Sequence, residues 1–205
     1  MKAMLLLSMM IVPAFLTTAD RADAQIRKPQ LGIYGGGTIP VQDFKEETDI
    51  GWHVGGLIKV RVTGALDVRL DGAFNKLGSK AVDFLAASVE SKSDVLFGAL
   101  NAELNLGPDS AAYPGDNSIS PYITAGPALY RHKFEGTCTG TCAGFVDNGE
   151  ETSLGFNIGA GANIPLRGFP AFAEVRYHRF GTMFPISQED ASAAILTASF
   201  GIKIR

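Results

Sequence analysis

The residues best suited to chemistry lie near the C-terminal end of the sequence, at Glu174, Arg176 and His178. Residues two apart in an extended strand point to the same face, so these three side chains would share one face. An acid, a cation and an imidazole suit acid–base chemistry, and acyl transfer would also need a nucleophile within hydrogen-bond reach of the histidine. No serine lies two residues from His178, which is followed by Arg179 and Phe180. We therefore interpret His178 as part of a polar network and predict no catalytic residue.

The N-terminus carries an export signal. Lys2 precedes an apolar run at residues 3–16, and Ala22 and Ala24 form a small-residue cleavage site, which together predict a signal peptide at residues 1–24. A membrane anchor is the alternative, but the run is shorter than the ~20 residues that a spanning helix needs. Residues 25–205 would then form one mature domain. The sequence has a net charge of −3 and no basic run, so we predict no nucleic-acid partner.

Alternating side chains dominate the rest of the sequence. At residues 65–75, polar Asp67, Arg69 and Asp71 alternate with apolar Val68 and Leu70, so one face of a strand would carry charge and the other hydrocarbon. Similar alternation predicts eight strands, at residues 31–39, 52–62, 65–75, 95–106, 122–134, 153–164, 171–180 and 194–204. Most exceed the usual ~5–6 residues of soluble sheets and match tilted strands that cross a membrane.

The two faces decide between two environments. In an eight-stranded antiparallel up-and-down transmembrane β-barrel, the apolar face meets lipid and the polar face fills the lumen. In a soluble, lipocalin-like binding barrel the apolar face would be the core. Long strands, small residues on the polar face and the aromatics Trp52, Phe74, Tyr177 and Phe180 favour the membrane. The predicted lumen would then hold a network of ion pairs, formed by Lys59, Arg61, Asp67, Arg69, Asp71, Glu103, Glu174, Arg176 and Lys203.

The sequence resembles the eight-stranded outer-membrane barrel proteins of the OmpA/OmpX type. The residues that carry the resemblance are the segments 66–74, 121–126 and 172–177 and a Gly-rich first strand, and it extends over the whole mature chain. The resemblance implies an outer-membrane location, contact with outer-membrane lipids and assembly by the barrel assembly machinery. One departure is the end of the sequence: such proteins usually end on an aromatic residue, whereas Phe200 is the last aromatic here.

The remaining candidate sites are few. Cys138 and Cys142 are the only cysteines, and export to an oxidising compartment favours a disulfide between them. A metal site would need further ligands nearby, and the Gly-rich segment 34–37 precedes no helix, so we predict no metal and no cofactor. His53 and His132 would be isolated and near the rims.

Three functions remain open. The first is a plugged outer-membrane barrel that presents loops at residues 41–50, 78–94 and 135–152, with a role in envelope integrity, adhesion or contact with an extracellular ligand. The second is a small porin for ions or small solutes. The third is a lipid A-modifying enzyme, which the missing serine–histidine–acid pattern disfavours.

Overall fold

The structure is a computed structural model that describes residues 29–42, 44–84, 87–107, 119–140, 148–166, 169–181 and 192–204. The predicted signal peptide at residues 1–24 lies outside these ranges and stays a prediction.

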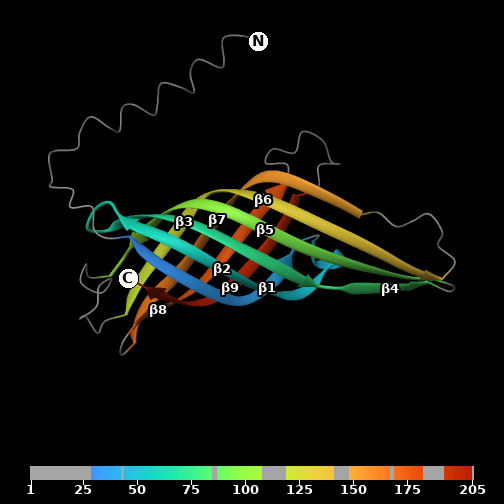
Figure 1. Ribbon diagram of the computed structural model, residues 1–205, viewed down its shortest axis with the longest axis horizontal. Coiled ribbons are helices and arrows are strands. Elements are labelled where there is room, and N and C mark those ends of the chain that lie inside the picture. Colours follow the sequence, from blue (N-terminus) through green and yellow to red (C-terminus); the bar gives the residue numbers. More distant parts are fainter. Residues whose placement is uncertain are drawn as a thin grey trace, which may run out of the picture.

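Antiparallel strands close into a barrel. Apart from β3 and β4, each strand pairs with its neighbour in the sequence, and β1 pairs with β9 to close the ring. β3 and β4 both pair with β5, one after the other, so they form a single barrel strand interrupted at Ser79. The predicted eight-stranded antiparallel barrel is therefore confirmed (Figure 1). The elements are β1 (Gln30–Val41), α1 (Phe44–Glu47), β2 (Asp49–Arg61), β3 (Leu66–Gly78), β4 (Lys80–Phe84), β5 (Ala87–Asn105), β6 (Ser120–Gly140), β7 (Asn148–Leu166), β8 (Phe169–Gly181) and β9 (Ser192–Ile204).

The alternation in sequence becomes alternation between lumen and exterior. Along β3, buried and exposed residues follow one another almost strictly. Asp67, Arg69 and Asp71 are 1–3% exposed, whereas Val68 and Leu70 are 40% and 54% exposed. A strand can satisfy both environments because successive side chains point to opposite faces of the sheet.

Glycines let the strands approach closely where the sheet bends. A Cβ at Gly36 would lie 1.8 Å from the carbonyl oxygen of Ala198 on β9, so no larger residue fits at this β1–β9 contact. Gly inside a strand often marks such a close backbone approach. The Gly-rich first strand thus helps to close the barrel.

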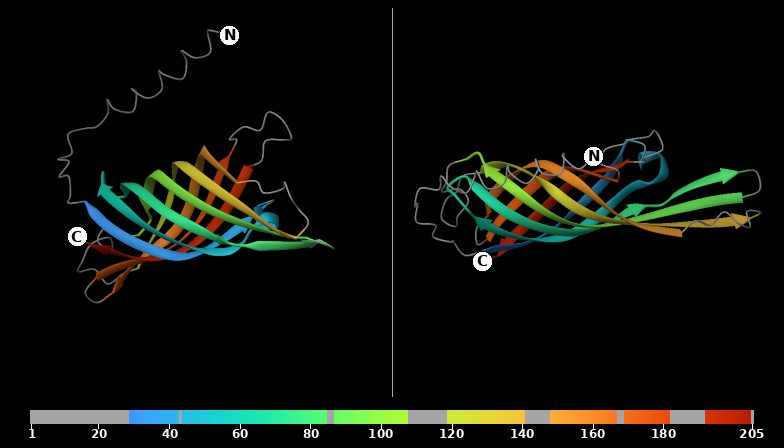
Figure 2. Two further views of the ribbon diagram at one scale, coloured as in Figure 1. Left: turned by 45° about the vertical axis from the view of Figure 1, so that its right-hand side comes forward. Right: turned by 90° about the horizontal axis from the view of Figure 1, so that it is seen from above.

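One side of the barrel extends well beyond the other. β2 stops pairing with β3 at Asp49 and Gly78, and β7 begins to pair with β8 at Gly155 and Phe180. Beyond these points β4, β5, β6 and β7 pair only with one another among the described residues. We call this four-stranded projection the wing: β4 with residues 87–93, 131–140 and 148–153. Figures 1 and 2 show it projecting past the barrel end.

The wing corrects two predictions. Residues 78–94 and 135–152 were expected to be loops, but β4, β5, β6 and β7 extend into both segments. The third predicted loop, residues 41–50, contains the short helix α1. In the described residues, no helix is long and apolar enough to cross a membrane.

Candidate functional site: the filled lumen

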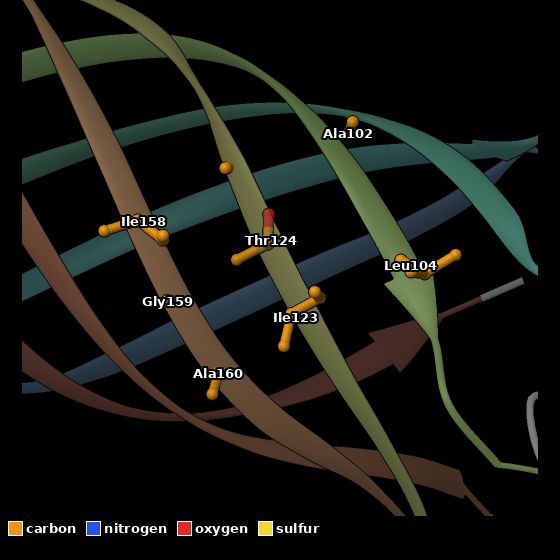
Figure 3. A pocket seen from close by; sticks show the side chains of 8 residues that line it. Ala102, Leu104, Ile123, Thr124, Ile158, Gly159 and Ala160 are labelled. Carbon is orange, nitrogen blue, oxygen red and sulfur yellow. The ribbon is translucent and has the colours of Figure 1, made fainter.

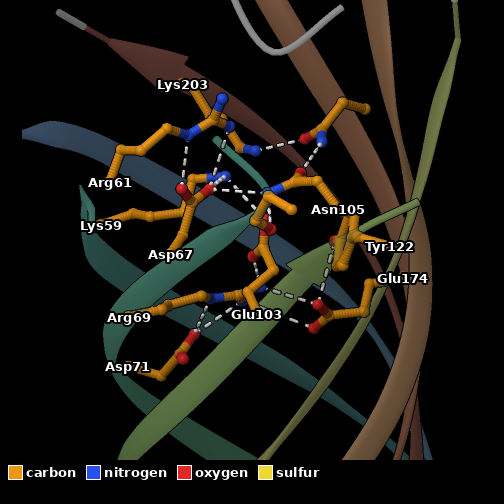
Figure 4. A network of polar contacts seen from close by, with 12 residues as sticks. Lys59, Arg61, Asp67, Arg69, Asp71, Glu103, Asn105, Tyr122, Glu174 and Lys203 are labelled. Carbon is orange, nitrogen blue, oxygen red and sulfur yellow. Dashed lines mark hydrogen bonds and ion pairs between the residues drawn. The ribbon is translucent and has the colours of Figure 1, made fainter. Parts of the chain in front are cut away.

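Charged side chains from five strands converge on the lumen in the half of the barrel nearest Gln30 and Ile204 (Figure 4). We call the barrel end with Gln30 and Ile204 the terminal rim and the opposite end the extended rim. All the charged residues predicted for the lumen lie in the half of the barrel nearest the terminal rim. They are Lys59 and Arg61 on β2, Asp67, Arg69 and Asp71 on β3, Glu103 on β5, Glu174 and Arg176 on β8, and Lys203 on β9.

Arg69 is the centre of this network. Its guanidinium lies 2.6 Å from Asp71 Oδ1, 2.7 Å from Glu174 Oε2 and 3.4 Å from Glu103 Oε2, and the side chain is 1% exposed. Its Cζ also lies 5.6 Å from the centre of the Phe172 ring, which is cation–π geometry. One buried guanidinium thus joins carboxylates from β3, β5 and β8 across the barrel. Its planar fork of five donors suits this arrangement.

A second cluster lies closer to the terminal rim. Lys59 Nζ lies 2.6 Å from Glu103 Oε1 and 2.9 Å from Asp67 Oδ2, and Arg61 Nε donates to Asp67 Oδ1 at 2.6 Å. Asn105 Nδ2 also donates to Asp67, at 3.0 Å. Glu103 therefore links this cluster to Arg69, so that the network is continuous.

The two remaining lumenal cations, Arg176 and Lys203, have different kinds of partner. Arg176 Nη2 lies 2.6 Å from Glu174 Oε1 and 3.6 Å from Asp71 Oδ1. Lys203 donates to the amide oxygen of Asn163, and its Nζ lies 5.3 Å from the centre of the Phe172 ring. Tyr122, whose hydroxyl donates to Glu174 Oε2 at 3.0 Å, lies under the same ammonium.

Aromatic rings fill the lumen toward the extended rim. The rings of Tyr130 and Phe180 stack with centroids 4.8 Å apart, and Phe97 lies 4.8 Å from the His178 ring. Phe44 of α1 is 5% exposed and packs edge-on against Phe180 and the His132 ring, at 6.0 and 5.4 Å. Helix α1 therefore closes the lumen from the extended side with an inserted phenylalanine. We call these six residues, Phe44, Phe97, Tyr130, His132, His178 and Phe180, the aromatic layer.

The aromatic layer corrects one sequence-based assignment. Phe180 was expected among the membrane-flanking aromatics, but it is 3% exposed inside the barrel. Trp52 and Phe74 do lie outside, with rings 6.2 Å apart and Trp52 50% exposed. The sequence did contain a signal for the lumenal position of Phe180. It lies two residues from His178, so both side chains point to the lumenal side of β8.

A chain of hydrogen bonds centred on His53 lies between the ionic network and the aromatic layer, and the sequence did not predict it. His53 was expected to be isolated, but it is 3% exposed, with Nδ1 3.0 Å from Thr38 Oγ1 and Nε2 2.8 Å from Ser199 Oγ. Thr38 donates its own proton to Asn75 Oδ1 at 3.0 Å. His53 Nδ1 must then be the donor to Thr38, and Nε2 accepts from Ser199. These residues come from β1, β2, β3 and β9, and no local spacing connects them.

The Ser199–His53 pair has the bond that a nucleophile and its base share. In a catalytic triad, a carboxylate binds the other nitrogen of the histidine and stabilises the imidazolium. Here the other nitrogen, Nδ1 of His53, binds the hydroxyl of Thr38 instead. Ser199 is 9% exposed and faces the packed lumen. The geometry therefore fits a structural hydrogen-bond chain. His178 also has a hydroxyl partner at each ring nitrogen, with Nδ1 3.0 Å from Tyr130 Oη and Nε2 3.3 Å from Thr197 Oγ1.

The sequence predicted a disulfide and no metal site. Cys138 lies on β6, where it pairs with Val89, but Cys142 is outside the described residues, so the disulfide between them stays a prediction. Within the described ranges, no group of three or more His, Cys, Asp or Glu residues could hold a metal ion.

A comparison with protein families decides the assignment of the barrel. A family model for the outer membrane protein beta-barrel domain matches residues 3–203. The chain belongs to this family. A search of the curated proteins finds no significant match.

The structure is similar to those of several solved proteins. Neisserial surface protein A is 13% identical, with a TM-score of 0.59, covering 86% of this chain and 96% of that one. The N-terminal barrel domain of OprF from Pseudomonas aeruginosa is 17% identical, with a TM-score of 0.44 and coverages of 85% and 97%. Ail of Yersinia pestis, solved with the heparin analogue sucrose octasulfate, is 13% identical, with a TM-score of 0.42 and coverages of 86% and 97%.

The family places the barrel in the outer membrane, and its exterior suits lipid. Large apolar side chains such as Ile33, Leu70, Leu100, Ile158 and Phe200 are 54–56% exposed on the outside of the barrel. Such side chains occur around the barrel, far beyond the few hundred Å² of apolar patch that a soluble monomer shows. The outer membrane supplies the acyl chains that cover this surface, and the soluble binding barrel is excluded.

Proposed function

We propose that this outer-membrane barrel is a closed anchor that holds the wing at the cell surface for contact with an external partner. The observation that carries the proposal is the filled lumen, with the ionic network and the aromatic layer one after the other along the barrel axis. An eight-stranded barrel is only wide enough for its own side chains to fill. Such a barrel offers little path for solutes, so its function is expected at its outer end.

The strand lengths support a role outside the membrane. β6 has 21 residues and β5 has 19, whereas a tilted strand needs only ~9–11 to cross the bilayer. Outer-membrane barrels have short periplasmic turns and longer extracellular segments, so we place the wing outside the cell and the terminal rim in the periplasm. About half of each long strand is therefore free for contact.

Polar side chains suit the wing to an aqueous setting. Arg131 Nε lies 2.5 Å from Glu150 Oε1 and Lys133 Nζ lies 2.5 Å from Glu135 Oε1, with all four side chains 44–58% exposed. The Lys133 ammonium lowers the pKa of the Glu135 carboxyl by a hydrogen bond. Exposed pairs of this kind contribute little stability. They keep the wing soluble while leaving its surface available to a partner.

The porin alternative makes a different prediction. A small porin needs a continuous watery path, whereas the lumen side chains Arg69, Glu103, Tyr130, Asn157 and His178 are all 0–2% exposed. For the third alternative, the Ser199–His53 pair lacks both a carboxylate partner and a described route for a lipid, so we propose no enzymatic role.

Two measurements test the proposal together. In planar bilayers the purified protein should show at most rare, small currents, and large stable channels would refute the closed anchor. Cells that display the full barrel should adhere to protein-coated surfaces, or to one another, more strongly than cells with a shortened wing. The shortened form replaces residues 80–91 by an Asn-Gly turn, because Lys80 pairs with Ser91 and the flanking strands can then close as a hairpin. Equal adhesion by both forms would refute the proposed role of the wing in contact with a partner.

A further inference from the structure

The wing has two edges that no strand covers among the described residues (Figure 2). One is the β4 edge, residues 80–84, which pairs only with β5 in this part of the chain. The other is the β7 edge, residues 148–152, which within the described ranges pairs only with β6. It ends at Ser153, whose Oγ accepts a hydrogen bond from the backbone N–H of Gly181 at 3.1 Å. A strand edge of this kind presents a series of backbone N–H and C=O groups that is a template for a further strand.

The two edges run in opposite directions. The four strands of the wing are successively antiparallel, so β4 runs away from the terminal rim and β7 runs toward it. A second copy in the same membrane has the same orientation as the first, and its β4 edge is therefore antiparallel to the β7 edge of the first copy. A symmetric antiparallel contact between two copies of one edge would instead need one copy turned upside down in the membrane.

The edges are also offset along the strands. We define a row as the line of directly paired residues that crosses the sheet. The β4 edge lies in the rows of β6 residues 136–140, through β5 residues 87–91. The β7 edge lies in the rows of β6 residues 131–135. Each edge is thus five residues long, and the β7 edge is displaced by five residues toward the terminal rim.

The tilt of the barrel strands matches this offset. The row that begins at Leu66 of β3 passes through Leu104, Ile123 and Ala160, the last three labelled in Figure 3, and returns to β3 at Lys76. It has then moved ten residues away from the terminal rim over eight barrel strands, or five residues over four. With ~3.3 Å per residue and ~4.8 Å between strands, the tilt is about 40°, which is typical of outer-membrane barrels.

A neighbouring copy therefore brings its β4 edge to the right height. Two positions that are four strands apart and equally high in the membrane differ by five residues, with the later strand in a row closer to the terminal rim. The position beyond the β7 edge is the fourth strand from β4. At equal height, the β4 edge of a second copy thus falls beside the β7 edge of the first.

We propose that neighbouring copies of this chain in one outer membrane join edge to edge, the β4 edge of each copy pairing with the β7 edge of the next. A second copy supplies an edge of equal length, opposite direction and equal height. Four strands at ~4.8 Å and a tilt of ~40° place the barrels roughly 25 Å apart. The two edges of one copy differ, so the contact is heterologous and can extend into arrays. It leaves the faces of the wing free, and so goes beyond the proposed contact with an external partner.

Charge selects the register of this pairing. Paired residues point to the same face of a sheet, so the offset between copies is an even number of residues, four or six. An offset of four places Lys80 of one copy opposite Glu151 of the next, whereas an offset of six places Asp83 opposite Glu150. Opposite charges across a ladder stabilise it and like charges destabilise it. The register is therefore the offset of four, which leaves a step of ~3 Å along the strand from the ideal five.

Zero-length cross-linking of the wild-type protein in phospholipid vesicles tests the pairing. A carbodiimide joins an amine to a carboxylate in direct contact, and a mixture of nitrogen-14 and nitrogen-15 chains identifies links between copies. We expect a link between Lys80 and Glu151 of different copies, and a gel ladder that extends beyond the dimer. Within one chain these residues lie three strands apart, ~14 Å, which is too far for such a link. An absence of linked copies, or links that join β4 to β4, would overturn the proposal.

Charge reversal tests the register. Lys80→Glu and Glu151→Lys each place like charges opposite one another, and each should lower the association constant roughly two- to thirtyfold in sedimentation equilibrium in density-matched micelles. The variant with both changes should associate as the wild type does. Lys92→Glu is the matched control and should have no effect, because Lys92 is 54% exposed on β5, inside the wing. A failure of the double variant to recover, or an equal loss in Lys92→Glu, would refute the register.

Two controls keep these outcomes clear. A heat-shift gel shows that each variant is folded before its association is measured. Neither experiment contains an external partner, so the adhesion test of the closed anchor can fail while the edge pairing holds, and the edge pairing can fail while the wing still adheres.

Discussion

Replacing Arg69 by methionine gives the sharpest test of the ionic network. The substitution keeps an unbranched side chain in the lumen but removes the cation that joins Asp71, Glu103 and Glu174 at 2.6, 3.4 and 2.7 Å. Removing one partner of a buried pair costs roughly 3–5 kcal/mol, because an uncompensated charge stays buried. The structure indicates which of the three carboxylates loses most.

Two of the carboxylates keep a close cation in Arg69→Met. Glu103 retains Lys59 at 2.6 Å, and Glu174 retains Arg176 at 2.6 Å. Among the described residues, Asp71 keeps the amide of Asn101 at 2.8 Å and Arg176 at 3.6 Å. One carboxylate is thus left poorly compensated, so we expect a loss at the lower end of that range, about 3 kcal/mol.

Reversible urea unfolding in lipid vesicles measures the loss. Trp52 is the single tryptophan and is 50% exposed on the outer surface, so its fluorescence follows insertion of the barrel into lipid. With a urea slope of roughly 1–3 kcal/mol/M, a loss of ~3 kcal/mol lowers the midpoint by about 1–3 M. The control Leu70→Met changes an outward neighbour on the same strand and should shift the free energy of unfolding by less than ~1 kcal/mol.

A double-mutant cycle identifies the cause. Asp71→Asn combined with Arg69→Met should be less destabilising than the sum of the two single losses, since the neutral amide at position 71 no longer leaves a charge unpaired. A loss below ~1 kcal/mol in Arg69→Met would mean that water already solvates these carboxylates. The lumen would then be wet, and the closed anchor would be wrong.

Three further predictions follow from other parts of the molecule. Phe180→Ala should lower the free energy of unfolding by roughly 3–5 kcal/mol, the cost of a cavity in a packed aromatic layer, measured by the same urea titration. Glu135 should titrate below the usual range of a glutamate in a carbon-13 NMR titration and return toward it in Lys133→Ala, so that the small stability from this pair is lost as the pH falls; an unchanged midpoint would show that the pair does not form. Protein folded in the periplasm should lack free thiols at Cys138 and Cys142 by mass spectrometry, and detection of two thiols would refute the disulfide.

Much of the barrel could be predicted because its signal is local. The parity of Asp67, Val68, Arg69 and Leu70 already separates lumen from lipid, since two-residue periodicity is a property of the strand alone. The same parity places the charged residues in the lumen. It does not specify which of them meet, because Arg69 reaches Glu174 across 105 positions of the chain. Partner choice depends on barrel closure and tilt, which no short segment encodes.

The parts that were not predicted depend on contacts between distant segments. The wing contains many Ser, Thr and Gly residues, and its strands persist because residues 87–94 of β5 pair with residues 133–140 of β6. The aromatic layer had a visible signal, since Phe97 shares its parity with Asn101 on β5, and Tyr130 shares its parity with Tyr122 on β6. The expectation of a polar lumen hid this signal. A lumen that side chains must fill can be filled by rings as well as by ion pairs.

The order of the layers along the barrel axis has a consequence for conduction. In the proposed closed anchor, the ionic network around Arg69 and the aromatic layer around Phe180 close the lumen in series, and we expect either layer alone to block ions. Arg69→Met and Phe180→Ala should therefore each lose stability while remaining as silent as the wild type in planar bilayers. Only the double variant, which carries both changes, loses a sealing side chain from each layer. Its currents in planar bilayers should therefore rise. A heat-shift gel shows whether the double variant still folds into the membrane. Channels in either single variant would mean that the other layer does not seal, and the two halves of the lumen would then have to be assigned different roles.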